Sequence, residues 1–288
     1  MEYKEMIAEL EALNLSQGIK AEVIPHGRNL RFQLDKSDPD KLELFNRLFS
    51  SYLKTRTVPF DGENISSYVQ KLSVALNEYL GLLWPTNPFA HQSDFASSII
   101  PEALCTLFRA VIVANDVDLD VSAEVDLTIE CTFSASGLGT AQYKNKRVDV
   151  AVIKPCTMQF NGVESVLPVP LLAIECKTNL DKNMLSGIEQ SVTDLKKTFP
   201  ACKYYVVSEL SDFDVSLNYA SSDIDEIYIL RKQKRGSIRS GHCTRNSVQA
   251  ELLMELVRSL DDAIRRMQTP MPSLNKRMLV GKLIGRRG

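Results

Sequence analysis

Two apolar runs that carry charged side chains constrain the fold of this chain more than any other feature. The first, Arg147-Val-Asp-Val-Ala-Val-Ile153, is rich in valine and contains Asp149; the second, Leu171-Leu-Ala-Ile-Glu-Cys-Lys177, ends with Glu175 and Lys177. Runs of this length and composition are typical of strands in a sheet. Charges inside such strands cost free energy unless they meet solvent, a partner or a metal. The pattern therefore predicts neighbouring strands with three charged groups at the rim of one sheet.

The triplet Glu175-Cys-Lys177 is informative because it lies on a predicted strand. The chain has two other acid-x-Lys triplets, Glu2-Tyr-Lys4 and Asp194-Leu-Lys196. Both fall in stretches with helical periodicity, where residues two apart do not share a face. Residues two apart in a strand do share a face, so only Glu175 and Lys177 are predicted to act together.

Two carboxylates and an ammonium on one sheet rim suit phosphodiester hydrolysis assisted by a divalent metal. Mg²⁺ takes oxygen ligands, commonly one or two carboxylates with waters and a phosphate oxygen, so Asp149 and Glu175 are candidate metal ligands. The cation acidifies a bound water, and Lys177 is the candidate group that orients this water or offsets charge on the phosphate. The Cys176 side chain is expected to face away, while its backbone carbonyl is a third candidate metal ligand. The alternative is that these charges are solvated ends of edge strands.

The order of elements around these strands predicts an α/β fold. Residues 122–134 alternate apolar and polar as a half-solvated strand does, and Asn161-Gly162 is a hairpin signal between the two charged strands. The elements predicted next are an amphipathic helix over residues 184–199 and strands over residues 203–208 and 226–230. A meander followed by a helical crossover indicates a mixed central β-sheet flanked by helices.

Basic residues are concentrated towards the C-terminal end. From Arg231 to Gly288 the sequence has 14 Lys and Arg against 4 Asp and Glu, a net of +10, whereas the whole chain has −2. This asymmetry hints at a polyanionic partner, and the alternative is a basic segment that docks on its own acidic domain.

The cysteines and the N-terminal residues indicate the cellular compartment of the protein. The six cysteines are scattered without a CxxC pair, which favours reduced thiols over a cysteine-based zinc site. The first residues lack the pattern of a signal peptide, and no apolar run reaches the length of a membrane span. We therefore expect a cytoplasmic protein without a membrane partner.

The sequence resembles the PD-(D/E)xK nuclease superfamily over residues 93–208, where Asp149, then Glu175-Cys-Lys177, precede an amphipathic helix and a strand. The usual proline before the first acid is absent, because Val148 precedes Asp149. The resemblance implies a restriction-endonuclease-like core. It also implies a further catalytic acid on the helix before the sheet, for which Glu102 is the candidate; the alternative is an acid favoured by the helix dipole.

Three further stretches are similar to restriction endonucleases of the BbvCI kind: Asp181–Gln190, Thr198–Pro200 and Tyr204–Glu209. Those enzymes use two related subunits on an asymmetric site. The resemblance implies one subunit of a Mg²⁺-dependent type II site-specific deoxyribonuclease that binds double-stranded DNA and leaves 5′-phosphates. A homodimer or a heterodimer with a related subunit is expected. The alternatives are a structure-specific nuclease of DNA repair or recombination, a non-catalytic DNA-binding subunit, and a nuclease with an RNA substrate.

We expect three regions. Residues 1–90 form a mostly helical N-terminal region for DNA recognition or dimerisation, with a hairpin at residues 22–34; residues 91–230 form the catalytic core; residues 231–288 form a basic C-terminal extension. The candidate DNA contacts are Arg231, Lys232, Lys234, Arg235, Arg239 and Arg245 in the extension, with Arg28 and Arg31 in the hairpin. Arginine to guanine is the commonest base contact, and phosphate contact or plain solvation is the alternative for each residue.

Overall fold

The computed structural model describes residues 1–60, 62, 64–86, 94–133, 141–160, 162–213, 222–268, 278, 279 and 281. The predicted boundary between residues 90 and 91 and most of the tail after residue 268 lie outside these ranges. The helices are α1 (Tyr3–Gln17), α2 (Pro25–Asp35), α3 (Leu42–Arg56), α4 (Ile65–Thr86), α5 (Asp94–Ser97), α6 (Ile99–Ala114), α7 (Lys182–Thr198), α8 (Arg235–Arg239) and α9 (Ala250–Gln268), with short 3-10 turns at Ala21–Val23 and Pro39–Lys41. The strands are β1 (Asp120–Phe133), β2 (Ala141–Phe160), β3 (Val163–Leu180), β4 (Lys203–Ser211) and β5 (Glu226–Ile229).

One mixed sheet organises the molecule, with its strands in the order β1-β2-β3-β4-β5. β2 pairs antiparallel with β1 and β3, whereas β4 pairs in parallel with β3 and β5. Phe160 pairs with Val163 across a two-residue turn, where Gly162 has a φ of 76° that glycine adopts freely. α7 is the crossover that the parallel strands β3 and β4 require. The predicted α/β class with a mixed sheet is confirmed.

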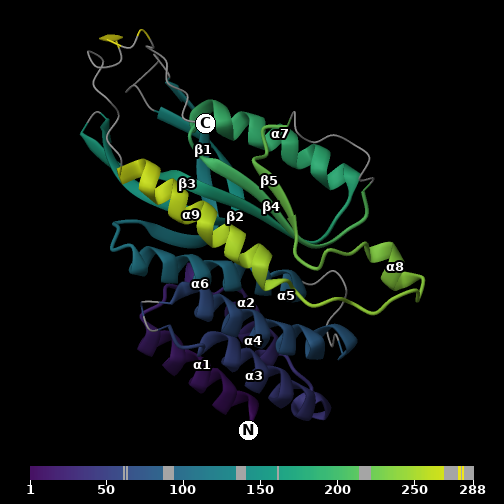
Figure 1. The fold of residues 1–288 in the computed structure, drawn as a ribbon. Coiled ribbons are helices and arrows are strands. Elements are labelled where there is room, and N and C mark those ends of the chain that lie inside the picture. Colours follow the sequence, from purple (N-terminus) through teal and green to yellow (C-terminus); the bar gives the residue numbers. More distant parts are fainter. Residues whose placement is uncertain are drawn as a thin grey trace.

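Apolar cores cover both faces of the sheet. On one face, Leu185, Ile188 and Val192 of α7 belong to the same cluster as Ala173 and Val206 of the sheet. On the other face, α6 and α9 pack against the sheet, and one continuous cluster extends from there into α1 to α4. Figure 1 shows this layering, with α7 above the strands and α6 and the N-terminal helices below them. Burial on both faces explains why the central strands are nearly continuous apolar runs.

The predicted N-terminal hairpin is helix α2 instead, so that prediction is wrong. Pro25 occupies the first turn of the helix, where its fixed φ fits and its missing N–H is not needed. Gly27, Leu30 and Leu34 are buried, and their spacing is that of one helical face. A Cβ at Gly27 would lie 2.6 Å from the Tyr52 hydroxyl. The glycine therefore allows α2 to approach α3 closely and does not mark a turn.

Contrary to the expectation that no apolar run reaches the length of a membrane span, the stretch Phe95–Ala114, across α5 and α6, is long and apolar enough to cross one. In this fold it is a core segment, since 78% of its most apolar part is buried inside the protein. A core helix of a soluble protein has the same composition.

Candidate active site

Asp149 and Glu175 lie side by side where β2 and β3 stop pairing. The last pair in the ladder between these strands is Val150 with Ile174, and the two acids are the next residues on each strand. The backbone N–H of Cys176 donates to Asp149 Oδ2 at 2.6 Å and links the strands at this point. The structure therefore brings the two predicted metal ligands together at an opening of the sheet.

The Lys177 ammonium contacts both carboxylates. Its Nζ atom lies 2.8 Å from Glu175 Oε1 and 3.9 Å from Asp149 Oδ2. Glu175 and Lys177 meet because alternate residues of a strand share a face. The register partner of Glu175 is Val206, which packs under α7. The cluster thus lies on the face of the sheet that α7 covers.

Two further side chains, which the sequence analysis missed, contact Glu175. Lys146 Nζ lies 3.7 Å from Glu175 Oε2, and the Tyr204 hydroxyl donates to the same oxygen at 3.4 Å. Tyr204 could have been predicted as a member of the cluster, since the alternation of side chains in β4 places it on the face that α7 covers. Lys146 could not, because the alternation of β2 is irregular here: Val148 and Ala151 are three residues apart and yet both pack under α7.

The charges of the cluster shift one another's pKa values. Burial, followed by the charge of Glu175, raises the pKa of the Asp149 carboxyl. Burial lowers the pKa of the Lys177 ammonium, but the adjacent Glu175 and Asp149 carboxylates raise it more, so the net pKa is raised. Burial and then the charge of Glu175 raise the pKa of Tyr204, which keeps its hydroxyl a donor. Two acids forced together in this way favour a bound cation.

The oxygen atoms of the cluster fit a Mg²⁺ ion. Among the described residues, no three or more His, Cys, Asp or Glu side chains are placed to hold a metal together. Asp149 and Glu175 offer two carboxylates, and the Cys176 carbonyl is near enough in the chain to add an oxygen; Mg²⁺ commonly takes this few protein ligands. The Cys176 side chain packs into the core on the opposite face, as expected. The ammonium groups of Lys146 and Lys177 show that these oxygens already attract positive charge.

Glu102 lies in a buried network on the opposite face of the sheet, which corrects its assignment as a further catalytic acid. Its Oε1 accepts from the Tyr52 hydroxyl at 2.7 Å, and its Oε2 accepts from the Gly27 N–H at 2.8 Å. Arg56 Nη1 lies 3.7 Å from Oε1. Burial raises the pKa of Glu102, while the Arg56 charge and these hydrogen bonds oppose the rise. Both oxygens are therefore committed to joining α6 to α2 and α3.

Arg231 also lies in the interior, which corrects its assignment as a DNA contact. It is 3% exposed, and its Nε donates to Glu209 Oε2 at 2.8 Å. Glu209 is fully buried on β4 and accepts from the Trp84 indole N–H at 3.2 Å. The Arg245 guanidinium lies 4.1 Å from the centre of the Trp84 ring. These four residues, which we call the Glu209 anchor, fasten the basic segment to the sheet.

The other candidate DNA contacts lie nearer the surface. Ion pairs join Arg28 to Glu124 at 2.7 Å, Arg31 to Glu11 at 2.5 Å, Lys232 to Glu251 at 2.7 Å and Arg235 to Asp212 at 2.6 Å. Lys234 and Arg239, which flank and end α8, are exposed, and no acidic side chain within the described ranges is at ion-pair distance from them. DNA contact by these residues stays a prediction.

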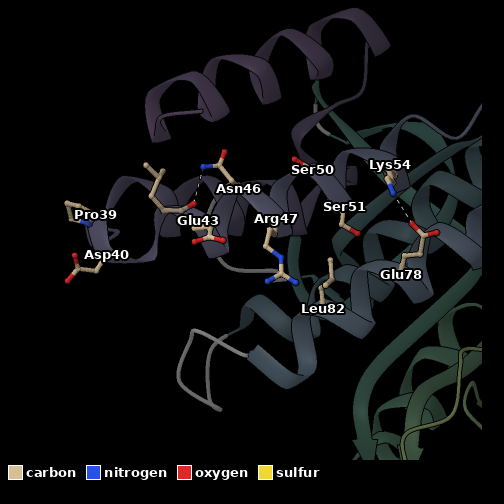
Figure 2. A pocket seen from close by; sticks show the side chains of 11 residues that line it. Pro39, Asp40, Glu43, Asn46, Arg47, Ser50, Ser51, Lys54, Glu78 and Leu82 are labelled. Carbon is tan, nitrogen blue, oxygen red and sulfur yellow. Dashed lines mark hydrogen bonds and ion pairs between the residues drawn. The ribbon is translucent and has the colours of Figure 1, made fainter.

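A surface groove lies between α3 and α4 (Figure 2). Its lining includes Arg47, Ser51 and Leu82, and Lys54 Nζ meets Glu78 Oε2 at 3.1 Å beside it. No residue of the carboxylate cluster lines this groove, so it is separate from the candidate active site.

Comparison with known proteins connects the chain with restriction enzymes. The family model described as Bpu10I restriction endonuclease matches residues 154–263, a range that includes Glu175 and Lys177 but not Asp149. Among solved structures, a chain of the native BbvCI A2B2 tetramer is similar, with a TM-score of 0.69 and 25% identity over 88% of this chain and 100% of that chain. No curated protein matches the chain.

The resemblance to a restriction endonuclease subunit of the BbvCI kind is confirmed. The match to the BbvCI chain extends over the helical N-terminal part as well as the sheet, so it covers more than the nuclease core. The family match runs from β2 to α9 and contains β3, α7 and β4, which carry or cover the cluster. Together these findings support a subunit of a type II restriction enzyme.

Proposed function

We propose that this chain is a Mg²⁺-dependent subunit of a type II restriction endonuclease, which hydrolyses DNA phosphodiester bonds at a specific sequence. The observation that carries the proposal is the cluster of Asp149, Glu175 and Lys177 at the opening between β2 and β3. Asp149 and Glu175 hold the cation, with the Cys176 carbonyl as a third ligand. A bound divalent cation polarises the phosphate and lowers the pKa of a coordinated water.

The remaining residues of the cluster prepare the site for attack on the phosphate. Lys177 orients the attacking water or offsets the negative charge that grows on the phosphate. Tyr204 donates to Glu175 Oε2 and so fixes the orientation of that carboxylate. Lys146 adds positive charge at the same oxygen. We expect the products to carry 5′-phosphates.

The partners that we propose are double-stranded DNA and a second, related subunit. The similar structure is titled an A2B2 tetramer. One carboxylate cluster cuts one strand per visit, so a double-strand break needs a second chain or a second binding event. A homodimer is the alternative assembly. Residues 1–90 serve recognition or dimerisation, residues 91–230 catalysis and residues 231–288 DNA contact, in a cytoplasmic enzyme.

Cleavage of plasmid DNA of mixed sequence in Mg²⁺, read on native and denaturing gels, tests this proposal. The chain is assayed alone and after co-expression with a related subunit. Discrete nicks or breaks at fixed positions are expected. Preference for branched DNA without regard to sequence would point to a repair nuclease instead.

Glu175→Gln is the decisive variant, because it removes a metal ligand and preserves the size of the side chain. It is expected to abolish the cut that this chain makes and to leave DNA binding largely intact. Glu164→Gln is the matched control, since Glu164 lies on the same strand but is exposed at its far end. Cleavage by Glu175→Gln at the rate of the control would show that the cluster is not the active site, as in a silent subunit.

A further inference from the structure

Asn179 is a buried amide without a hydrogen-bond partner, two residues beyond Lys177 on β3. The residue is 7% exposed, and among the described residues neither Oδ1 nor Nδ2 has a hydrogen-bond partner. A buried amide normally forms hydrogen bonds, since leaving its polar atoms unpaired costs free energy. Buried polar groups without a partner are often found where a catalytic residue or an ion acts. We therefore ask whether Asn179 forms a hydrogen bond in a second arrangement of the neighbouring charged cluster.

Strand geometry places Asn179 on the face of the candidate active site. Glu175, Lys177 and Asn179 alternate along β3 and so point to the same side of the sheet. The register agrees, because Lys177 pairs with Ser208 and Asn179 with Leu210 in β4, continuing the row that begins with Glu175 and Val206. Residues two apart in a strand are about 6.6 Å apart, which a lysine side chain can span.

The Lys177 ammonium contacts the two carboxylates that would hold the proposed metal. It lies 2.8 Å from Glu175 Oε1 and 3.9 Å from Asp149 Oδ2, so it neutralises the same oxygens that would hold the cation. A divalent cation held by Asp149 and Glu175 would repel the ammonium and would use the oxygens that now accept from it. Lys177 then needs a new acceptor within reach, because an ammonium has three donors and its loss of partners opposes metal binding.

We infer that the Asn179 Oδ1 atom accepts the Lys177 ammonium when a divalent cation takes Asp149 and Glu175. This inference rests on the proposed metal-dependent function of the cluster. Asn179 is then a positioning residue: it favours the arrangement in which the carboxylates are free for the metal. It also holds Lys177 on the same face of the strand, beside the cation, where its charge can act on the phosphate.

Binding of Mn²⁺ to the full chain without DNA tests the inference, because Mn²⁺ accepts the same oxygen ligands and can be followed by paramagnetic resonance. Asn179→Leu keeps the number and branching of the side-chain heavy atoms and removes the acceptor. It is expected to weaken Mn²⁺ binding about tenfold, the loss of one hydrogen bond to a charged group. Asn179→Ala should give the same loss, and thermal melts identify any variant that fails to fold. Thr178→Val is the matched control, since alternation places Thr178 on the opposite face.

A double-mutant cycle separates this role from a structural one. In a Lys177→Met background the ammonium that needs Asn179 as its acceptor is absent, while Lys146 is unchanged, so Asn179→Leu should leave Mn²⁺ affinity unchanged. An equal loss in both backgrounds would overturn the inference, because Asn179 would then act independently of Lys177. Unchanged affinity on Asn179→Leu alone would overturn it and leave the proposed function standing. Absence of Mn²⁺ binding that depends on Glu175 would overturn the proposed function itself and the inference with it.

Discussion

Replacing Arg231 with methionine is expected to destabilise the fold strongly, although the residue lies in a basic segment that the sequence assigns to DNA. The substitution keeps most of the buried volume but removes the main positive charge beside Glu209, which is fully buried. Breaking a buried ion pair by removing one partner costs about 3–5 kcal/mol. The Trp84 N–H still donates to Glu209, and the Arg245 guanidinium still lies 3.8 Å from it. We therefore expect the free energy of unfolding to fall by about 3 kcal/mol, the lower end of this range.

Thermal unfolding at pH 7 without DNA measures this loss. A change of about 3 kcal/mol corresponds to a fall in Tm of roughly 6–12 °C for a protein of this size. Arg235→Met is the matched control, because Arg235 also forms an ion pair, at 2.6 Å to Asp212, but its side chain is 34% exposed. A pair this open to solvent contributes about 1 kcal/mol or less, so the control should melt close to the parent.

Measurements of DNA binding at several salt concentrations should rank the two variants in the opposite order. Arg235→Met removes a residue near the surface and can lower the salt dependence of binding, whereas folded Arg231→Met protein should bind DNA with an unchanged salt slope. An Arg231→Met protein that melts with the parent and loses about one unit of salt slope would refute the Glu209 anchor and restore Arg231 as a phosphate contact.

Three further outcomes follow from other buried groups. Burial lowers the pKa of His26 from 6.5 to about 3, so the unfolded chain binds a proton that the folded protein does not. This histidine alone should lower the free energy of unfolding by about 1.4 kcal/mol per pH unit as the pH falls from 6.5 towards 3. Urea titrations of a His26→Gln variant should therefore show a smaller fall than those of the parent. Glu102→Gln should lower Tm, but the folded variant should cleave plasmid DNA in Mg²⁺ at a rate within a few-fold of the parent. Complete loss of cleavage with an unchanged Tm would restore Glu102 as a catalytic acid. Because burial raises the pKa of Asp149, its charged form disfavours the metal-free fold, so Asp149→Asn should stabilise that fold at pH 7 and by less at pH 4, in calorimetry with a chelator present.

The carboxylate cluster could be predicted from the sequence because it depends on two strands and their alternation. Long apolar runs interrupted by Asp149, Glu175 and Lys177 carry both the strand signal and the cost of buried charge. The Asn161-Gly162 signal then fixes which strands are neighbours and in which direction they run. Lys146 stayed hidden, since its approach to Glu175 depends on an irregularity of β2 that no sequence pattern marks.

The errors arose where a residue's role depends on segments far away in the chain. Pro25 and Gly27 are typical turn residues in sequence. In the fold they belong to helix α2, and Gly27 lies where α2 packs closely against Tyr52 of α3. Arg231 looks like one more charge in a basic segment, and only its contact with Glu209, 22 residues earlier, shows that it is a buried anchor. Local pattern can state that a charge needs a partner, but it cannot say which distant residue supplies one.

Glu102 shows how this limit bears on function. Its partners Tyr52 and Gly27 lie 50 and 75 residues earlier, so the first turn of α6 is held by the N-terminal helices and not by the carboxylate cluster. The cluster lies on the α7 face of the sheet, whereas Glu102 lies on the face that α6 covers. The N-terminal helices therefore support the sheet from behind the site. Substitutions in the Glu102 network should act on cleavage only through folding, while substitutions on the α7 face should act on chemistry at unchanged stability.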